Sequence, residues 1–142
     1  MMIADLEKHG VMLCVWFARA LMFFLIQGVG LLAAYAVMGF DTSPDVFPSG
    51  LRLDPIHAGV HALWGAAATY VGFWLPRRAV GFVLSFAVFY IAFAIVGTFT
   101  NHHFGMMLGP GVNAFHWTVG PLALIVALLG LRERHRGLRV NS

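Results

Sequence analysis

Long apolar runs separated by short polar segments dominate the hydrophobic pattern of this chain. A helix needs about 20 mostly apolar residues to cross the hydrocarbon core of a bilayer. Four runs meet this requirement, and they cover residues 20–40, 56–75, 79–99 and 113–131. In lipid each run must satisfy its own backbone hydrogen bonds, as a helix does. The pattern therefore predicts an all-α fold, a transmembrane four-helix bundle.

The residues before the first run are apolar too, but charges lie close to them. Residues 3–18 read "IADLEKHGVMLCVWFA" and precede Arg19. We favour a short N-terminal interfacial helix here, with Trp16 at headgroup depth; the alternative is that these residues lengthen a tilted first span. The "AYA" at 34–36 resembles a signal-peptide cleavage site, but the apolar stretch before it exceeds the roughly 7–15 residues of a signal peptide. We expect a retained span.

Composition supports a membrane protein. Of the 142 residues 60% are hydrophobic and 11% are charged, whereas soluble domains carry roughly a quarter charged residues. A soluble chain of this length has no interior large enough to hide so much apolar surface. We therefore expect residues 1–142 to form a single integral membrane domain. The one cysteine, Cys14, excludes an internal disulfide and a CxxC pair.

Positive charge alternates along the connections between the runs. Arg77 and Arg78 separate the second and third runs, and "RERHRGLR" follows the fourth. Positive residues mark cytoplasmic segments, so we expect both termini and this turn in the cytoplasm of a cell whose inner membrane holds the protein. The loops at 41–55 and 100–112 would then face outward. The arginine-rich tail is interpreted as a topology anchor, and no nucleic-acid partner is expected.

The chain matches itself when shifted so that His57 falls on His116. The shift relates a first repeat, about 19–75, to a second, about 78–134. Identical pairs include Arg19 and Arg78, Phe23 and Phe82, Leu25 and Leu84, Val37 and Val96, Val60 and Val119, and Leu63 and Leu122. Similarity at a fixed period indicates repeated structure. It predicts two tandem helical hairpins related by a pseudo-two-fold axis along the membrane normal.

The second helix of each repeat begins in the same way. "DPIH" at 54–57 matches "NAFH" at 113–116. Asp and Asn are favoured N-caps, and the histidines then occupy the third helical position, where a capping box places its returning side chain. The simplest interpretation is that His57 and His116 are capping residues.

His61 suggests a second interpretation of the same residues. It lies one turn after His57 on the same helical face, and an i, i+4 histidine pair can bind one metal. With His116 at similar depth, three imidazoles would converge into a cofactor-binding or metal site. His102 and His103, followed by Met106 and Met107, add candidate ligands from an outward loop. Such a set suits copper, zinc, haem or a chlorophyll-type pigment.

Few other residues in the runs carry chemistry. No Asp, Glu or Lys lies inside a run, and the sequence has no nucleophile–base pair or nucleotide motif. We expect Gln27 and Ser85, both mid-run, to make hydrogen bonds between helices. The leading hypothesis is a non-enzymatic structural or accessory subunit, with lipid, other membrane-protein subunits or a homo-oligomer as its partners. The second is a haem-, pigment- or metal-binding membrane protein, and the third a transporter subunit.

Several of these motifs resemble a known family. "HAGVHALWG", "NAFHWTVG" and the intervening "FYIAFAIVG" are similar to those of small bacterial four-span integral membrane proteins of unknown function. The resemblance covers about 19–131 and involves His57, Gly65 and Gly120 in particular, together with His61, Asn113 and His116. It implies four spans built from two hairpins and no catalytic roles. Loops of that family usually lack "HHFGMM", so the resemblance adds nothing to a metal role for that loop.

Overall fold

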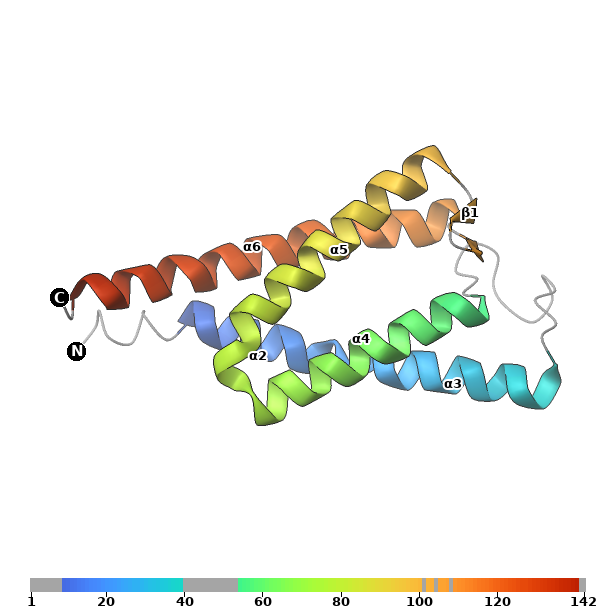
Figure 1. The fold of residues 1–142 in the computed structure, drawn as a ribbon, viewed down its shortest axis with the longest axis horizontal. Coiled ribbons are helices and arrows are strands. Elements are labelled where there is room, and N and C mark those ends of the chain that lie inside the picture. Colours follow the sequence, from blue (N-terminus) through green and yellow to red (C-terminus); the bar gives the residue numbers. More distant parts are fainter. Residues whose placement is uncertain (1–8, 40–53, 101, 104, 108, 141–142) are drawn as a thin grey trace.

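Helices account for nearly all of the described chain. The computed structural model describes residues 9–39, 54–100, 102–103, 105–107 and 109–140. The elements are α2 (His9–Ala20), α3 (Met22–Met38), α4 (Pro55–Trp74), the 3₁₀ helix η1 (Pro76–Arg78), α5 (Ala79–Phe99), β1 (His102–His103), β2 (Met106–Met107) and α6 (Pro110–Val140). The two short strands pair antiparallel in the α5–α6 connection. The predicted all-α class is confirmed (Figure 1).

The helices pack mainly with their sequence neighbours. α3 lies along α4, α5 lies along α6, and α2 packs against α4, α5 and α6. In Figure 1 the two pairs diverge from the η1 end of the molecule towards β1. Because α2 contacts members of both pairs, it joins them at the η1 end.

Glycines allow the paired helices to approach closely. A Cβ on Gly65 would lie 2.0 Å from the backbone nitrogen of Leu25, and one on Gly28 would lie 2.5 Å from that of Ala62. Backbones this near to one another are typical of membrane helix interfaces built from small residues. The α3–α4 contact therefore depends on the absence of side chains at these two positions.

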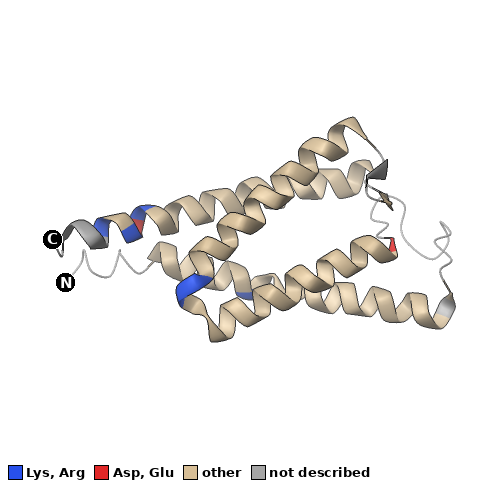
Figure 2. Cartoon of the chain, viewed as in Figure 1, with Lys and Arg blue, Asp and Glu red and all other residues tan. Residues whose placement is uncertain are grey.

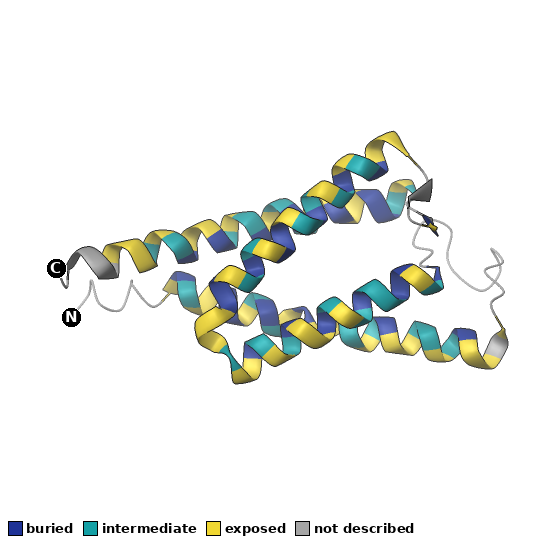
Figure 3. Ribbon diagram, in the orientation of Figure 1, coloured by how far each residue is buried: buried dark blue, intermediate teal, exposed yellow. Residues whose placement is uncertain are grey.

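The interior holds small and aromatic side chains, while large apolar side chains also cover the outside. Phe86 and Tyr90 are 0% and 1% exposed, whereas Val37, Leu63 and Phe99 are 86%, 73% and 82% exposed. Figure 3 shows buried residues along the inward faces of the helices and exposed residues along the outward faces. Apolar surface of this extent marks a membrane or protein interaction surface.

Three helical segments of the described chain are long and apolar enough to cross a membrane. They are His9–Val37, Pro76–Phe99 and Pro110–Arg136. These segments support the predicted membrane protein. α4 is not among them, because its two histidines and three glycines lower the mean hydropathy of its 20 residues. The fourth span, predicted at 56–75, therefore stays a prediction.

The predicted N-terminal interfacial helix stays a prediction, and the structure shows how its described residues pack. One face of α2 packs against the other helices, where Cys14 and Ala18 are 0% exposed, while Trp16 on another face is 59% exposed. A single residue, Leu21, separates α2 from α3. Small side chains permit this position: a Cβ on Gly10 would lie 2.9 Å from backbone atoms of Leu129 in α6. The alternative, a lengthened first span, is supported by length and composition, since residues 9–37 form one apolar segment. Residues 3–8 of the predicted helix lie outside the described chain.

Charge is distributed unequally between the two ends of the molecule. Arg77 and Arg78 in η1 and the arginines near the end of α6 lie at the end where α2 begins (Figure 2). Asp54 lies at the opposite end, at the start of α4. This distribution is the one that the positive-inside rule associates with a cytoplasmic and an outer side.

Candidate metal centre

Three buried histidines from two helices converge between the helix pairs. His57 and His61 come from α4 and His116 comes from α6, and they are 1%, 3% and 1% exposed. One candidate ligand atom from each lies within 4.8 Å of the others. The ring centroids of His57 are 4.8 Å from His61 and 5.4 Å from His116. The structure therefore brings together the three histidines that the sequence analysis singled out.

The start of α4 positions His57. Asp54 is the N-cap, and its carboxylate oxygen accepts a hydrogen bond from the backbone N–H of His57 at 2.9 Å. Pro55 follows at the first helical position, as the sequence predicts. The backbone of His57 completes the cap, which leaves its imidazole to point towards the other histidines. His61 lies one turn later on the same face.

The predicted cap at Asn113 is wrong. α6 begins at Pro110, so Asn113 already lies inside the helix, and its N–H donates to the carbonyl of Gly109 at 2.9 Å. Its amide instead bonds across to Thr98 of α5 at 3.3 Å. Pro110 starts the helix earlier because its fixed φ suits the first helical position. His116 is therefore a position within α6, supported from α5, and not a capping residue.

Gln27 of α3 fixes the orientation of His61. The Gln27 Oε1 atom lies 3.0 Å from His61 Nδ1. Because an amide oxygen only accepts, Nδ1 carries the proton and donates it, and Nε2 then keeps a free lone pair. Metal-binding histidines are held by this kind of outer hydrogen bond. The predicted interhelical bond of Gln27 is thus confirmed, whereas Ser85 donates within its own helix to the Gly81 carbonyl.

Several polar atoms in the cluster have no hydrogen-bond partner within the described part of the chain. They are His57 Nδ1, His61 Nε2, both ring nitrogens of His116, and the Tyr90 hydroxyl. A buried polar atom without a partner costs about 1–3 kcal/mol. A cluster of such atoms in one place is the arrangement expected of a binding site.

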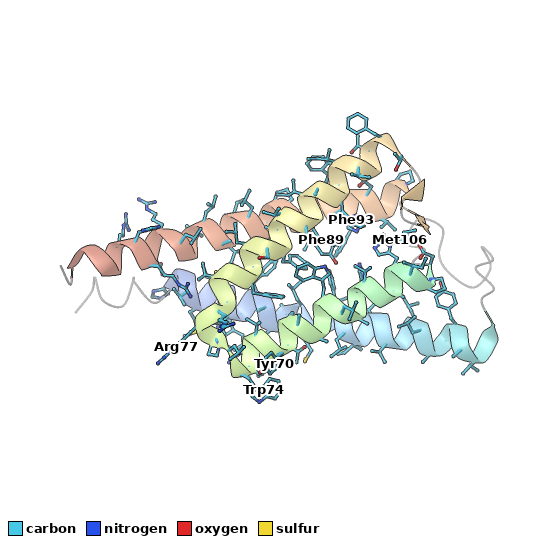
Figure 4. The ribbon with its side chains drawn as sticks, in the orientation of Figure 1. Tyr70, Trp74, Arg77, Phe89, Phe93 and Met106 are labelled. Atoms are coloured by element: carbon cyan, nitrogen blue, oxygen red, sulfur yellow. The ribbon has the colours of Figure 1, made fainter. Side chains whose placement is uncertain are left out.

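Aromatic rings enclose the histidines. Phe24 stacks on His61 with centroids 4.5 Å apart and planes 5° apart. Tyr90 and Phe93 of α5 make edge contacts with His116 at 5.3 and 5.9 Å. Figure 4 labels Phe93 and Met106 at this end of the molecule, and Met106 is 2% exposed. The rings exclude water and leave the space between the imidazoles as the place where a small ligand would lie.

The donor set suits an ion of borderline softness. Three neutral imidazoles bind zinc or copper, and zinc with three protein ligands keeps a fourth position open. With metal–nitrogen bonds of about 2.0–2.1 Å, tetrahedral geometry requires ligand atoms about 3.3–3.4 Å apart. Small side-chain rotations would bring the three atoms from their present separation to this value.

Sequence reasoning placed some site residues and missed others. His57, His61 and His116 were identified, but the role of Gln27 as the partner of His61 and the presence of Tyr90 were not. Gln27 was recognisable as a polar residue in an apolar run, whereas Tyr90 is one of many aromatic residues. The predicted ligands His102 and His103 form β1, and their side chains lie outside the described residues.

No family model, curated protein or solved structure matches this chain. The resemblance to small four-span bacterial proteins therefore remains a prediction from the motifs, and function has to be inferred from the site itself.

Proposed function

We propose that the chain is a helical membrane protein that binds one zinc or copper ion through His57, His61 and His116. The observation that carries the proposal is the convergence of the three buried imidazoles, whose candidate ligand atoms lie within 4.8 Å of one another. Of the hypotheses drawn from the sequence, metal binding is the one that this geometry favours.

Two features of the site support an ion over a packed core. The unpartnered ring nitrogens include at least one atom from each of the three histidines, so a shared ion would satisfy them together. The bond from His61 Nδ1 to Gln27 leaves Nε2 as the ligand atom. In a packed core we would expect both ring nitrogens of His61 to have hydrogen-bond partners. Here Nδ1 has one and Nε2 has none among the described residues.

The surroundings favour an ion over haem or a chlorophyll-type pigment. Phe24 lies flat against His61, and Tyr90 and Phe93 contact His116. A porphyrin bound between the imidazoles would have to displace these rings, whereas an ion fits between nitrogens already close together.

Metal analysis of the purified chain tests the proposal. The full-length protein is purified in mild detergent without chelators and loaded with zinc or with copper, and the bound metal is measured by elemental analysis. We expect about one ion per chain with the preferred metal. His61→Ala should abolish stoichiometric binding because it removes a ligand and the group that Gln27 orients.

His135→Ala is the matched control. His135 is an exposed residue of α6 outside the cluster, so its replacement should leave binding unchanged. Thermal unfolding of both variants checks that they fold. Metal-free wild-type protein after loading, or equal binding by wild type and a folded His61→Ala variant, would overturn the proposal.

The proposed architecture is a four-span bundle of two tandem hairpins, α3–α4 and α5–α6. Its support is the sequence repeat and the packing of each helix pair. The arginine-rich end would face the cytoplasm of a cell whose inner membrane holds the protein. The metal site would then lie towards the outer side, since Asp54 and α4 begin at the opposite end.

Other roles from the sequence analysis stay predictions. A structural or accessory role beside other subunits or in a homo-oligomer is compatible with metal binding, as is a non-enzymatic protein. Co-purification from gently solubilised membranes would test for such partners.

A further inference from the structure

A pocket at the arginine-rich end of the molecule is separate from the histidine cluster. Its lining residues are Val71 of α4, Arg77 and Arg78 of η1, Gly81 and Phe82 of α5, and Arg134 of α6, and its volume is about 390 Å³. Three arginines and two apolar residues thus line one open space. We propose that this pocket binds the phosphate headgroup of an anionic phospholipid.

The positive charge of the pocket is not neutralised by the described chain. The described chain has two acidic residues, Asp54 and Glu133. Asp54 caps α4 at the other end of the molecule. Glu133 accepts hydrogen bonds from the backbone N–H groups of Gly10 and Val11 at 2.7 and 3.3 Å. Arg134 donates to the carbonyl of Arg77, which holds α6 against η1 but leaves the charge of Arg134 uncompensated. An anion would therefore meet arginines whose charge no described acidic residue offsets.

Arg19 shows how an arginine of this protein is satisfied internally. It aligns with Arg78 in the sequence repeat, but its Nε donates to the Gly72 carbonyl at 2.9 Å and its guanidinium lies 4.9–5.0 Å from the ring centroids of Trp16 and Phe73. The arginine side chains of η1 have no comparable contacts within the described chain. Arg19 of the first repeat thus packs inside the protein, whereas the corresponding Arg78 of the second repeat lines the pocket.

The backbone beside the pocket also favours an anion. α5 begins at Ala79 without a side-chain cap and without an acidic residue in its first turn, and the N-terminus of a helix attracts negative charge. A Cβ on Gly81 would meet no atom within 4 Å. Gly81 therefore leaves open space at the first turn of α5.

The position of the pocket points to a lipid as the source of the phosphate. Tyr70 and Trp74, 56% and 66% exposed, lie on the last turns of α4, at the end of that helix which η1 follows (Figure 4). Exposed Trp and Tyr are typical of the membrane–water boundary, where basic pockets between helices bind anionic headgroups. Val71 and Phe82 supply apolar walls for the glycerol and the first part of the acyl chains.

Native mass spectrometry of the full chain tests the inference. The protein is released from micelles containing either phosphatidylglycerol or phosphatidylcholine, and the bound lipid is quantified over a titration. We expect preferential binding of phosphatidylglycerol. Arg78→Gln and Arg134→Gln should each weaken it about fivefold, in line with the contribution of one cation near a lipid surface, and replacement of all three pocket arginines should weaken it about 100-fold.

Matched controls separate this site from general attraction to charge. Arg132→Gln and Arg136→Gln make the same charge change at exposed positions of α6 outside the pocket, and we expect less than a twofold effect. Gly81→Leu should abolish the preference with no change in charge, because it fills the open space. Arg134→Gln removes the contact between α6 and η1 and could unfold the chain. In that case Arg78→Gln, which leaves this contact in place, still tests the inference.

Three outcomes would overturn the inference. Equal binding of both lipids would show that the pocket does not recognise the headgroup. An equal loss in the pocket and control variants would show diffuse electrostatics. Full competition by millimolar inorganic phosphate would identify a free phosphate, and not a lipid, as the ligand. None of these outcomes bears on metal binding by the histidines.

Discussion

Gln27 links the helix packing of this protein to its candidate metal site. Its amide oxygen accepts from His61 Nδ1 at 3.0 Å and comes from α3, whereas the histidine comes from α4. An interaction of this kind selects the tautomer with the lone pair on Nε2. A single amide of an apolar helix therefore determines which atom of His61 is available as a ligand.

Replacement of Gln27 should reduce metal affinity without removing a ligand. Gln27→Leu keeps the approximate volume but removes the acceptor, so His61 loses its orientation. We expect a 10- to 100-fold weaker affinity, the usual cost of losing an outer hydrogen-bond partner, measured by competition with a chelator of known affinity. Ser85→Ala is the control, since its hydroxyl bonds only to Gly81 within α5. Unchanged affinity in a folded Gln27→Leu variant would contradict this role.

Small residues allow the closest contacts between the helices of this protein. Gly28 and Gly65 let α3 and α4 approach until backbone atoms lie where a Cβ would be. In α5 and α6, Gly97 gives room to the amide of Asn113, whose Oδ1 lies 2.5 Å from the Cβ position of Gly97. Lipid offers little hydrophobic driving force between helices, so close packing and hydrogen bonds decide their association.

Adding one methyl group at the α3–α4 contact should destabilise the fold. A Cβ at Gly65 would be 2.0 Å from the Leu25 nitrogen, so Gly65→Ala must push the helices apart. We expect a loss of about 1–3 kcal/mol, as for other overpacked cores, measured by reversible unfolding in mixed micelles. At Gly59 a Cβ meets nothing within 4 Å, so Gly59→Ala should be neutral or stabilise by up to about 1 kcal/mol. Equal stabilities would contradict the close contact.

At the scale of the whole molecule, the candidate metal site and the arginine pocket lie at different ends of the helices. The histidines gather near the start of α4, and the arginines line a pocket beside η1, where α4 ends and α5 begins. One orientation in the membrane would place the metal site towards the outer side and the pocket at the cytoplasmic boundary. This orientation also requires α4 to cross the bilayer.

Cysteine labelling in intact cells tests the orientation and the fourth span together. The native Cys14 is 0% exposed, so background labelling by a membrane-impermeant maleimide should be low. Ile56→Cys and Thr100→Cys should react from outside, whereas Pro76→Cys and His135→Cys should react only after the membrane is opened. Equal reaction of Ile56→Cys and Pro76→Cys in intact cells would show that α4 does not cross. Labelling of Pro76→Cys and His135→Cys, but not of Ile56→Cys and Thr100→Cys, in intact cells would show the reverse orientation.

Much of the helical organisation follows from the sequence because lipid imposes it. The run at 79–99 is α5 with the same bounds, and the run at 56–75 differs from α4 by one residue at each end. Asp54 and Pro55 mark the start of α4 through local hydrogen bonding and a fixed φ, which need no distant contact. Local chemistry also places His57 and His61 on one helical face.

Contacts between distant segments decided how α2 packs, what Asn113 bonds to and which histidines meet. Residues 9–20 are apolar enough for an interfacial helix, and only the structure shows that one of their faces packs against α6. Asn113 is of a residue type that often caps helices. Because α6 already begins at Pro110, its side chain instead forms a hydrogen bond with Thr98 of α5. The meeting of His116 with His57 and His61, and of Gln27 with His61, depends on how separate helices cross, because periodicity specifies the face of a helix but not its partner.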